Sequence, residues 1–267
     1  MGRIDTIFAD LRTSNRKALM PFVCAGHPRT DSLPDILFAL QHDGASIVEI
    51  GIPFSDPIAD GPIIAAAMHN AIQNGCTPGM ILDQVRSIRE RLHIGLVAMV
   101  SISIMQRLAS GSDLRPIVNR FRDAGFDGFI FPDLPLEESD PWRTAASDAG
   151  LSCTFLIAPT TPPERAAKIA AASTGFLYLL ARSGITGERS EMPDLSGRIQ
   201  ELRKTSQLPI AVGFGISTPD HVRHVVQTAD AAIVGSAMVR RLSDIPAGQS
   251  AAQVAGDFCR QLASGLA

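Results

Sequence analysis

Three carboxylates lie close together in the N-terminal part of the chain, around a proline-rich loop. Glu49 lies near the end of a short apolar run, residues 47–50, that is typical of a buried strand. Asp56 and Asp60 lie in the loop that follows, before an apolar helical pattern opens at Pro62. A charged residue at the end of an apolar strand is costly to bury. With two further acids within reach, this arrangement indicates acid–base chemistry at one end of a barrel or sheet.

Two of these acids also have an ordinary structural explanation. Asp60 precedes Gly61 and Pro62, where a short carboxylate can cap a helix by accepting hydrogen bonds from its free N–H groups. Asp56 lies directly before a proline and could be only a turn residue. Glu49 has no comparable explanation, because strands disfavour glutamate and a buried carboxylate needs a partner.

Two glycine-bearing segments late in the chain indicate a phosphate site. Gly213 and Gly215 follow one apolar run, while Gly235 and Ser236 follow the next and open a short helix. Glycine lets backbone N–H groups approach an anion closely, and a helix N-terminus supplies a favourable dipole. Either segment alone could be a structural turn, but the loops after the last two strands of a barrel commonly bind phosphate.

Two aromatic residues are candidates for the wall of a binding pocket. Phe22, near the end of the first predicted strand, would offer an apolar face to an aromatic substrate. Tyr178 is the only tyrosine of the chain, and it lies within the sixth predicted strand. Each could equally be an aromatic residue of the core.

Other kinds of catalytic site find little support. His221 and His224 share one helix face, but no third ligand is evident, so no metal site is expected. A Ser-His-Asp mechanism lacks its nucleophile elbow. The cysteines are far apart in sequence and favour neither a zinc site nor a disulfide framework; they are Cys24, Cys76, Cys153 and Cys259.

Short apolar runs alternate with amphipathic segments along the whole chain. This rhythm predicts a single (β/α)8 barrel domain over residues 1–267, with an extra N-terminal helix over residues 4–11 that closes the barrel floor. An open, doubly wound sheet is the alternative, because the number of strands does not prove closure. The predicted strands are residues 19–24, 47–50, 95–100, 128–131, 152–157, 176–180, 210–212 and 231–234. The predicted helices are residues 33–41, 63–73, 80–92, 114–124, 140–149, 163–172, 195–205 and 219–228.

In such a barrel the chemistry belongs to the loops at the C-terminal ends of the strands. Residues 181–193, after the sixth predicted strand, are polar and rich in glycine, and they include Thr186 and Gly187. This composition suits a mobile lid over an active site.

The composition excludes several classes of protein. The chain has 267 residues, 45% of them hydrophobic, which is enough to form one large α/β domain. A net charge of −3 gives no electrostatic basis for binding nucleic acid or an acidic membrane surface. No apolar stretch is long enough to span a membrane and the N-terminus lacks a signal-type core, so a cytoplasmic location is expected.

The acid-bearing loop, residues 49–62, closely resembles the signature of the tryptophan synthase α subunit family. The resemblance extends over nearly the whole chain. It includes residues 21–26, 132–138, 178–187, 213–217 and 235–237. It implies a (β/α)8 barrel that cleaves indole-3-glycerol phosphate to indole and glyceraldehyde 3-phosphate, without a metal or an organic cofactor in this chain.

The resemblance also implies the roles of particular residues. Glu49 would protonate indole C3 and then remove the proton of a side-chain hydroxyl, which requires a raised pKa, while Asp60 would accept a hydrogen bond from the indole N–H. Phe22 would line the indole pocket, Tyr178 would lie beside Glu49, and Thr186 would close over the site toward Asp60. The phosphate would be held by Gly187, Gly215, Gly235 and Ser236.

The implied partner is the pyridoxal-phosphate-dependent β subunit of an α2β2 heterotetramer. Asp56 and its loop would face that subunit, which receives the indole. The chain departs from the family where a tyrosine and an asparagine usually follow the third strand, because Met99 and Ser101 stand there. Met99 can still pack against an indole, and Ser101 is a shorter hydrogen-bonding group.

Three functions remain open from the sequence. The first is the α subunit, and the second is a self-sufficient lyase that releases free indole, which the changes at Met99 and Ser101 leave open. The third is a barrel that mainly binds and activates a β subunit, although a non-catalytic scaffold would not need Glu49 and Asp60. A sugar-phosphate isomerase is disfavoured, because the usual lysine or histidine catalysts are absent from the strand ends.

Overall fold

The computed structural model describes residues 2–57, 60–109, 111–181, 193–213 and 215–266. Its strands are all parallel and lie in the order β5-β4-β3-β2-β1-β9-β8-β7-β6. They are β1 (Ala18–Cys24), β2 (Ile47–Gly51), β3 (Gly95–Met99), β4 (Gly128–Ile130), β5 (Ser152–Thr154), β6 (Leu156–Ile157), β7 (Leu177–Leu180), β8 (Ile210–Gly213) and β9 (Ala231–Val234).

The sheet closes into a barrel through one interrupted strand. β5 pairs with β4 and β6 pairs with β7, and only Phe155 separates β5 from β6 along the chain. The two ends of the strand order are therefore the two halves of one strand, and the open-sheet alternative is wrong. The predicted barrel is confirmed, with its fifth strand broken where an uninterrupted one was expected.

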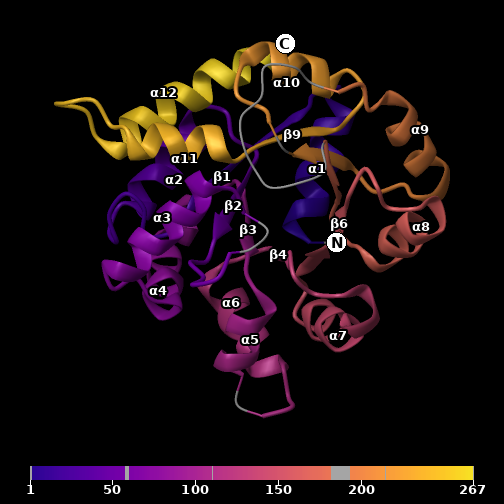
Figure 1. Ribbon diagram of the computed structural model, residues 1–267, viewed down its shortest axis with the longest axis horizontal. Coiled ribbons are helices and arrows are strands. Elements are labelled where there is room, and N and C mark those ends of the chain that lie inside the picture. The colour runs from indigo at the N-terminus through magenta and orange to yellow at the C-terminus, as the bar shows by residue number, and fades with distance from the viewer. Residues whose placement is uncertain (1, 58–59, 110, 182–192, 214, 267) are drawn as a thin grey trace.

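The helices surround the strands (Figure 1). They are α1 (Arg3–Thr13), α2 (Leu33–His42), α3 (Pro62–Gln73), α4 (Pro78–Ile88), α5 (Ile102–Leu108), α6 (Arg115–Ala124), α7 (Asp140–Asp148), α8 (Pro163–Ala172), α9 (Ser196–Thr205), α10 (Pro219–Val226), α11 (Ser236–Ser243) and α12 (Ala251–Ala263). Short 3-10 turns cover Arg89–Arg91, Leu136–Glu138 and Ser264–Leu266. Proline opens α3, α4, α8 and α10, where its missing N–H costs no hydrogen bond.

Helix α1 closes the N-terminal end of the barrel. Its apolar face, Ile4, Phe8 and Leu11, packs against inward-facing strand residues such as Met20 and Val97. In Figure 1 this helix, in indigo, lies inside the ring of outer helices. The predicted barrel floor is confirmed, and the opposite end of the barrel is left for the loops that follow each strand.

No helix among the described residues is long and apolar enough to cross a membrane.

Candidate active site

Glu49 lies inside the barrel on β2, between Phe22 of β1 and Val97 of β3, its register partners on the two neighbouring strands. The residue is 0% exposed, and neither carboxylate oxygen has a hydrogen-bond partner among the described residues. Burial raises the pKa of Glu49 well above its usual range, which favours the protonated carboxyl.

A buried carboxyl without a partner is a cost to the fold. Nearly all buried polar groups in proteins are hydrogen-bonded, and exceptions concentrate at sites of chemistry. Among the described residues, the other buried side-chain atom without a partner is Nε of Arg198. The guanidinium of Arg198 is nevertheless held by its two other nitrogens, which donate to Thr161 and Glu201. Glu49 therefore has the strongest physical case for a catalytic role.

Asp60 does not cap the following helix, and its ionisation differs from that of Glu49. Its N–H donates to the Pro57 carbonyl at 3.0 Å, and the N-cap of α3 is the next residue, Gly61, where no side-chain cap bond is formed. The helix-cap explanation of Asp60 is therefore not supported. Burial raises the pKa of Asp60 to about 6, so above that pH the side chain is a partly buried anion.

Tyr178 lies on β7, buried inside the barrel. Burial raises the pKa of its phenol, and the charges of Glu49 and then Asp60 raise it further, so the three side chains are electrostatic neighbours. The ring crosses the end of the next strand, because a Cβ built on Gly213 would lie 2.5 Å from the Tyr178 hydroxyl. At neutral pH the phenol is protonated, so its hydroxyl can donate one hydrogen bond and accept others.

Phe22 lies on β1, between the strand of Glu49 and β9. Its ring is buried and crosses the end of β2 at Gly51. On the other side, a Cβ built on Gly235 would lie 4.0 Å from Phe22 Cβ. Phe22 thus lies between the acid on β2 and the glycine that follows β9.

Two of the phosphate candidates lie where β9 ends and α11 begins. Gly235 is the N-cap of α11 and Ser236 is the first residue of that helix, and no side chain of the described residues caps the helix there. Its first N–H groups therefore have no side-chain acceptor at the cap, which favours an anion in that position. Gly215 has a φ of 83°, a left-handed conformation that favours glycine. Thr186 and Gly187 lie outside the described residues.

A cavity of about 200 Å³ opens beside Asp60 at the barrel mouth. Met68, Met99 and Phe54 form its apolar walls, and exposed Asp56 lies at its rim. At its far side the Ser101 hydroxyl donates to Asp133 Oδ2 at 2.6 Å, and the Ile102 N–H donates to Asp133 Oδ1 at 2.8 Å.

Asp133 thereby fixes the first turn of α5, and sequence reasoning assigned it no role. The run of residues 132–138 had marked this loop only through its resemblance to the family.

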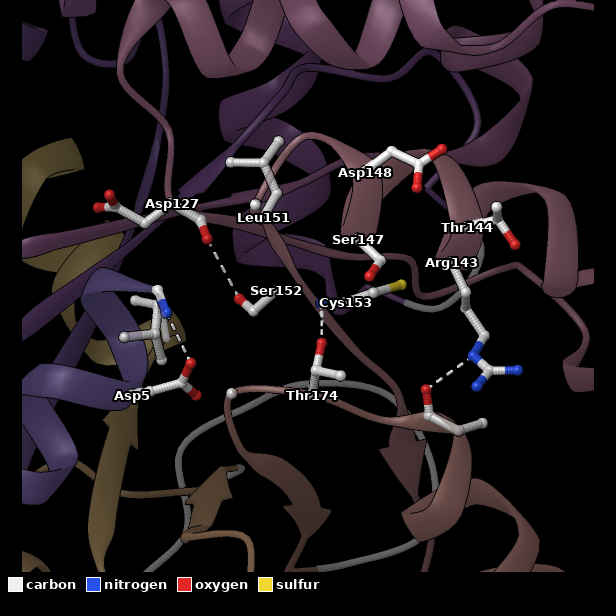
Figure 2. A pocket seen from close by; sticks show the side chains of 15 residues that line it. Asp5, Asp127, Arg143, Thr144, Ser147, Asp148, Leu151, Ser152, Cys153 and Thr174 are labelled. Atoms are coloured by element: carbon white, nitrogen blue, oxygen red, sulfur yellow. Dashed lines mark hydrogen bonds between the residues drawn. The ribbon is translucent and has the colours of Figure 1, made fainter.

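A second, larger cavity, about 460 Å³, lies at the opposite end of the barrel (Figure 2). Its polar groups pair with one another: the Gly2 N–H donates to Asp5 at 2.8 Å, and the Cys153 N–H donates to Thr174 Oγ1 at 2.8 Å. Figure 2 also shows the Ser152 hydroxyl donating to the Asp127 carbonyl. This cavity lies against α1, away from the acids, and is not the candidate active site.

The histidines and cysteines of the described chain form no competing site. No group of three or more His, Cys, Asp or Glu in those residues could hold a metal ion. His221 Nδ1 accepts a bond from the Ser217 N–H, and His27 Nε2 lies 3.1 Å from Ser243 Oγ. All four cysteines are buried and free, and burial raises the pKa of the Cys24 thiol above its usual range, so it is unreactive as a thiolate.

The sequence was compared with known proteins. A family model described as tryptophan synthase alpha chain matches residues 8–264 of the sequence.

The chain belongs to the tryptophan synthase alpha chain family.

Two curated relatives in the tryptophan synthase alpha chain family match over nearly the whole chain. The tryptophan synthase alpha chain of Prochlorococcus marinus strain MIT 9313 is 41% identical over 261 residues, which cover 97% of this chain and 93% of that protein. The one of Synechococcus sp. strain CC9902 is 42% identical over 257 residues, with coverage of 96% and 94%.

Solved structures agree in fold with this member of the tryptophan synthase alpha chain family. Tryptophan synthase subunit alpha from Legionella pneumophila str. Paris superposes with a TM-score of 0.90 at 30% identity, covering 100% of this chain and 98% of its own. A structure of Mycobacterium tuberculosis tryptophan synthase in space group F222 superposes with a TM-score of 0.89 at 30% identity, with coverage of 99% and 98%.

Proposed function

We propose that this chain cleaves indole-3-glycerol phosphate to indole and glyceraldehyde 3-phosphate by general acid–base chemistry at Glu49 and Asp60. Family membership gives the reaction class, a carbon–carbon lyase of the tryptophan synthase α reaction. The observation that carries the residue assignment is the pair of acids at one barrel end. Glu49 is buried, has no hydrogen-bond partner among the described residues, and has its pKa raised by burial, whereas the more accessible Asp60 is ionised above about pH 6.

Glu49 supplies the proton that the reaction needs first. Indole leaves poorly as a carbanion, so C3 must be protonated before the bond to the side chain can break. The carboxylic acid of Glu49 gives its proton to C3, and the resulting carboxylate takes the proton of the hydroxyl on the adjacent side-chain carbon. The C–C bond electrons then return to the indole ring, an aldehyde forms, and Glu49 is again protonated.

Asp60 stabilises the charge that appears between those two proton transfers. Protonation at C3 places a positive charge on the indole nitrogen, and a carboxylate that accepts the N–H hydrogen bond lowers the energy of that cation. A carboxylate that is partly removed from water interacts more strongly with such a charge than an exposed one does. The opposite ionisation of Glu49 and Asp60 at neutral pH matches these two roles.

The remaining residues bind the two ends of the substrate. Phe22 lines the indole pocket, and Tyr178 fills the space beside Glu49 as a neutral phenol. Gly215, Gly235 and Ser236 hold the phosphate, supported by the uncapped start of α11. Gly187 adds a phosphate contact and Thr186 closes the lid toward Asp60; both assignments rest on the sequence resemblance.

The indole is passed to a partner, the pyridoxal-phosphate-dependent β subunit, in an α2β2 heterotetramer. The cofactor belongs to that subunit, and the chemistry proposed for this chain uses only its own side chains. Asp56, exposed at the rim of the cavity beside Asp60, is the proposed contact residue. We propose a cytoplasmic location for the assembly, which the free thiols of all four cysteines support, because they fit a reducing compartment.

A self-sufficient lyase that releases free indole is the second candidate. One observation favours it. The end of β3 carries Met99 and Ser101 in place of the family's usual tyrosine and asparagine, and the Ser101 hydroxyl is hydrogen-bonded to Asp133 of the same chain. In this arrangement the loop is held by the chain's own contacts, without a partner.

Steady-state cleavage of indole-3-glycerol phosphate distinguishes the two candidate functions. The rate is measured for the purified chain alone and for the chain together with the tryptophan synthase β subunit from the same source. Weak activity that rises strongly with the β subunit supports the α-subunit function. Fast cleavage that the β subunit leaves unchanged supports the self-sufficient lyase. No cleavage under either condition contradicts the chemistry assigned to Glu49 and Asp60.

A further inference from the structure

Gly51 is the last residue of β2 and has no backbone reason to be glycine. It pairs in regular parallel register with Cys24 of β1 and Met99 of β3, and its φ is not among the positive values of the chain. Glycine inside a strand is destabilising, because it loses more conformational freedom on folding and has no side chain to pack. Its presence in a buried strand therefore marks a close approach by another group.

The group that approaches is the ring of Phe22. A Cβ built on Gly51 would lie 2.5 Å from Phe22 Cζ and 2.7 Å from Phe22 Cε2, closer than carbon atoms can pack. Met68 Cε, at 3.5 Å, is an ordinary contact. The space that a side chain at position 51 would need is thus taken by the outer edge of one aromatic ring.

The position of this ring affects both ends of the candidate site. Phe22 is the register partner of Glu49, and Gly235 lies on its other side after β9. The ring is buried in the core, so a methyl group at position 51 would force it either to turn or to push β2 outward. Either movement alters the space between the acid and the phosphate candidates.

We propose that Gly51 is a positioning residue of the active site, whose missing side chain lets the Phe22 ring lie across the end of β2 and form the wall against which the indole packs. This proposal rests on the function assigned to Glu49 and Asp60. Gly51 touches neither the substrate nor the reacting atoms, and it acts on the site only through Phe22.

The same arrangement recurs across the barrel. Tyr178 of β7 is the register partner of Ala211 on β8, and its ring crosses Gly213, two residues further along that strand. Phe22 is likewise paired with Glu49 and crosses Gly51, two residues further along. Side chains in strands lean along the strand direction, so a large ring reaches the position two residues beyond its partner, and only glycine leaves room there.

A double-mutant cycle between Gly51 and Phe22 tests the proposal. The variant Gly51→Ala is expected to raise the KM for indole-3-glycerol phosphate about tenfold, with a smaller change in kcat, because it disturbs binding of the ring more than proton transfer. Leucine lacks the two ring atoms that clash with a Cβ at position 51. In the Phe22→Leu background, Gly51→Ala should therefore change KM less than about twofold, because the two effects are coupled.

A matched control separates this role from simple crowding of a strand glycine. Gly95 begins β3 at the barrel floor, and a Cβ there would lie 2.6 Å from Ile4 Cδ1. The variant Gly95→Ala should lower the melting temperature and leave the KM unchanged. A rise in KM equal to that of Gly51→Ala would overturn the positioning role.

The cycle is also measured by thermal unfolding, without substrate. Gly51→Ala should lower the melting temperature more when it is introduced into the wild-type chain than when it is introduced into the Phe22→Leu variant. In the extreme case Gly51→Ala alone does not fold, but the double variant does. Equal effects of Gly51→Ala in both backgrounds, on KM and on melting temperature, would overturn the proposal. Absence of cleavage by the wild-type chain would instead overturn the proposed function.

Discussion

Glu49 and Phe22 are register partners on adjacent parallel strands, so a carboxyl group and a phenyl ring occupy one row of the barrel interior. The apolar neighbour and the absence of water-facing surface favour the uncharged form of the carboxyl. Burial accordingly raises the pKa of Glu49 well above its usual range. Burial in this row favours Glu49 as a proton donor, while the more exposed Asp60 is an anion above about pH 6.

The pH dependence of catalysis should follow the two acids. Activity needs Asp60 ionised and Glu49 protonated. Burial raises the pKa of Asp60 to about 6, so kcat/KM should fall below about pH 6, roughly tenfold for each further pH unit. At high pH the activity should fall again as Glu49 ionises. A profile of kcat/KM against pH, supported by NMR titration of carbon-13-labelled aspartate, checks the acid limb; a limb near pH 4 would contradict it.

Replacement of Asp60 by asparagine should raise the stability of the fold and lower the activity. Its pKa in the folded chain, about 6, exceeds its ordinary value of 3.8, so the folded state binds the proton more tightly than the unfolded state. The free energy of unfolding therefore falls as pH rises through this window, and the full penalty is present above about pH 6. The variant Asp60→Asn removes the penalty and should raise the free energy of unfolding at pH 8 by at most about 3 kcal/mol.

The same variant should be nearly inactive, because an amide cannot offset the charge on the indole cation. Thermal and urea unfolding at pH 8 and pH 4, together with steady-state rates, measure both effects. The stability gain should be much smaller at pH 4, close to the ordinary pKa of 3.8, because Asp60 is then protonated in the folded chain. Near-normal turnover, or a gain of equal size at both pH values, would contradict the role of Asp60.

The phosphate assignment makes a prediction about Gly235. A Cβ at this position would meet nothing nearer than Ile64 Cδ1, at 3.8 Å, so the free chain has room for alanine. A bound phosphate would have to share that space. Gly235→Ala should therefore raise the KM for indole-3-glycerol phosphate at least about tenfold, while the free energy of unfolding changes by only about 0.5 kcal/mol.

Gly79→Ala is the matched control for this variant. Gly79 lies in α4, where a Cβ would lie 3.9 Å from Thr77 Oγ1. It should leave both KM and stability close to the wild-type values. An unchanged KM in Gly235→Ala would show that the phosphate binds elsewhere.

The partner assignment is tested at Asp56. This residue is exposed on the loop after β2, and reversal of its charge by Asp56→Lys should reduce the stimulation of cleavage by the β subunit about tenfold or more. The stimulation is measured by titration of the β subunit against a fixed concentration of the chain. Asp148→Lys reverses an exposed charge near the opposite end of the barrel and should leave the stimulation intact. Equal stimulation of both variants would remove Asp56 from the interface.

The sequence predicted the barrel because its periodicity is strong. Each predicted strand contains or nearly matches an observed one, and α8 has the predicted bounds, Pro163–Ala172. The break at Phe155 was not predicted, because the apolar pattern continues through the residues on both sides. Helices α5 and α12 were also missed: α5 is short, and its first turn is fixed by Asp133, a contact from another loop that periodicity does not show.

The candidate site was only partly visible in the sequence. Glu49 was evident because an acid in an apolar strand is unusual, and the glycines near the ends of the last two strands indicated the proposed phosphate loops. The contact between Phe22 and Gly51 could not be predicted, because it depends on the register between β1 and β2, which the sequence does not give. The different ionisation of Glu49 and Asp60 likewise depends on their burial, which the sequence does not give.

The most direct test of the account is the cleavage of indole-3-glycerol phosphate by wild-type chain and by Glu49→Gln, measured with the dissociation constant of the substrate. The wild-type chain should release indole and glyceraldehyde 3-phosphate in equal amounts. Glu49→Gln should bind the substrate with similar affinity, yet turn it over at least about 10³-fold more slowly, because an amide neither donates nor accepts the required protons. Turnover of Glu49→Gln at a rate near that of the wild-type chain would contradict the central claim.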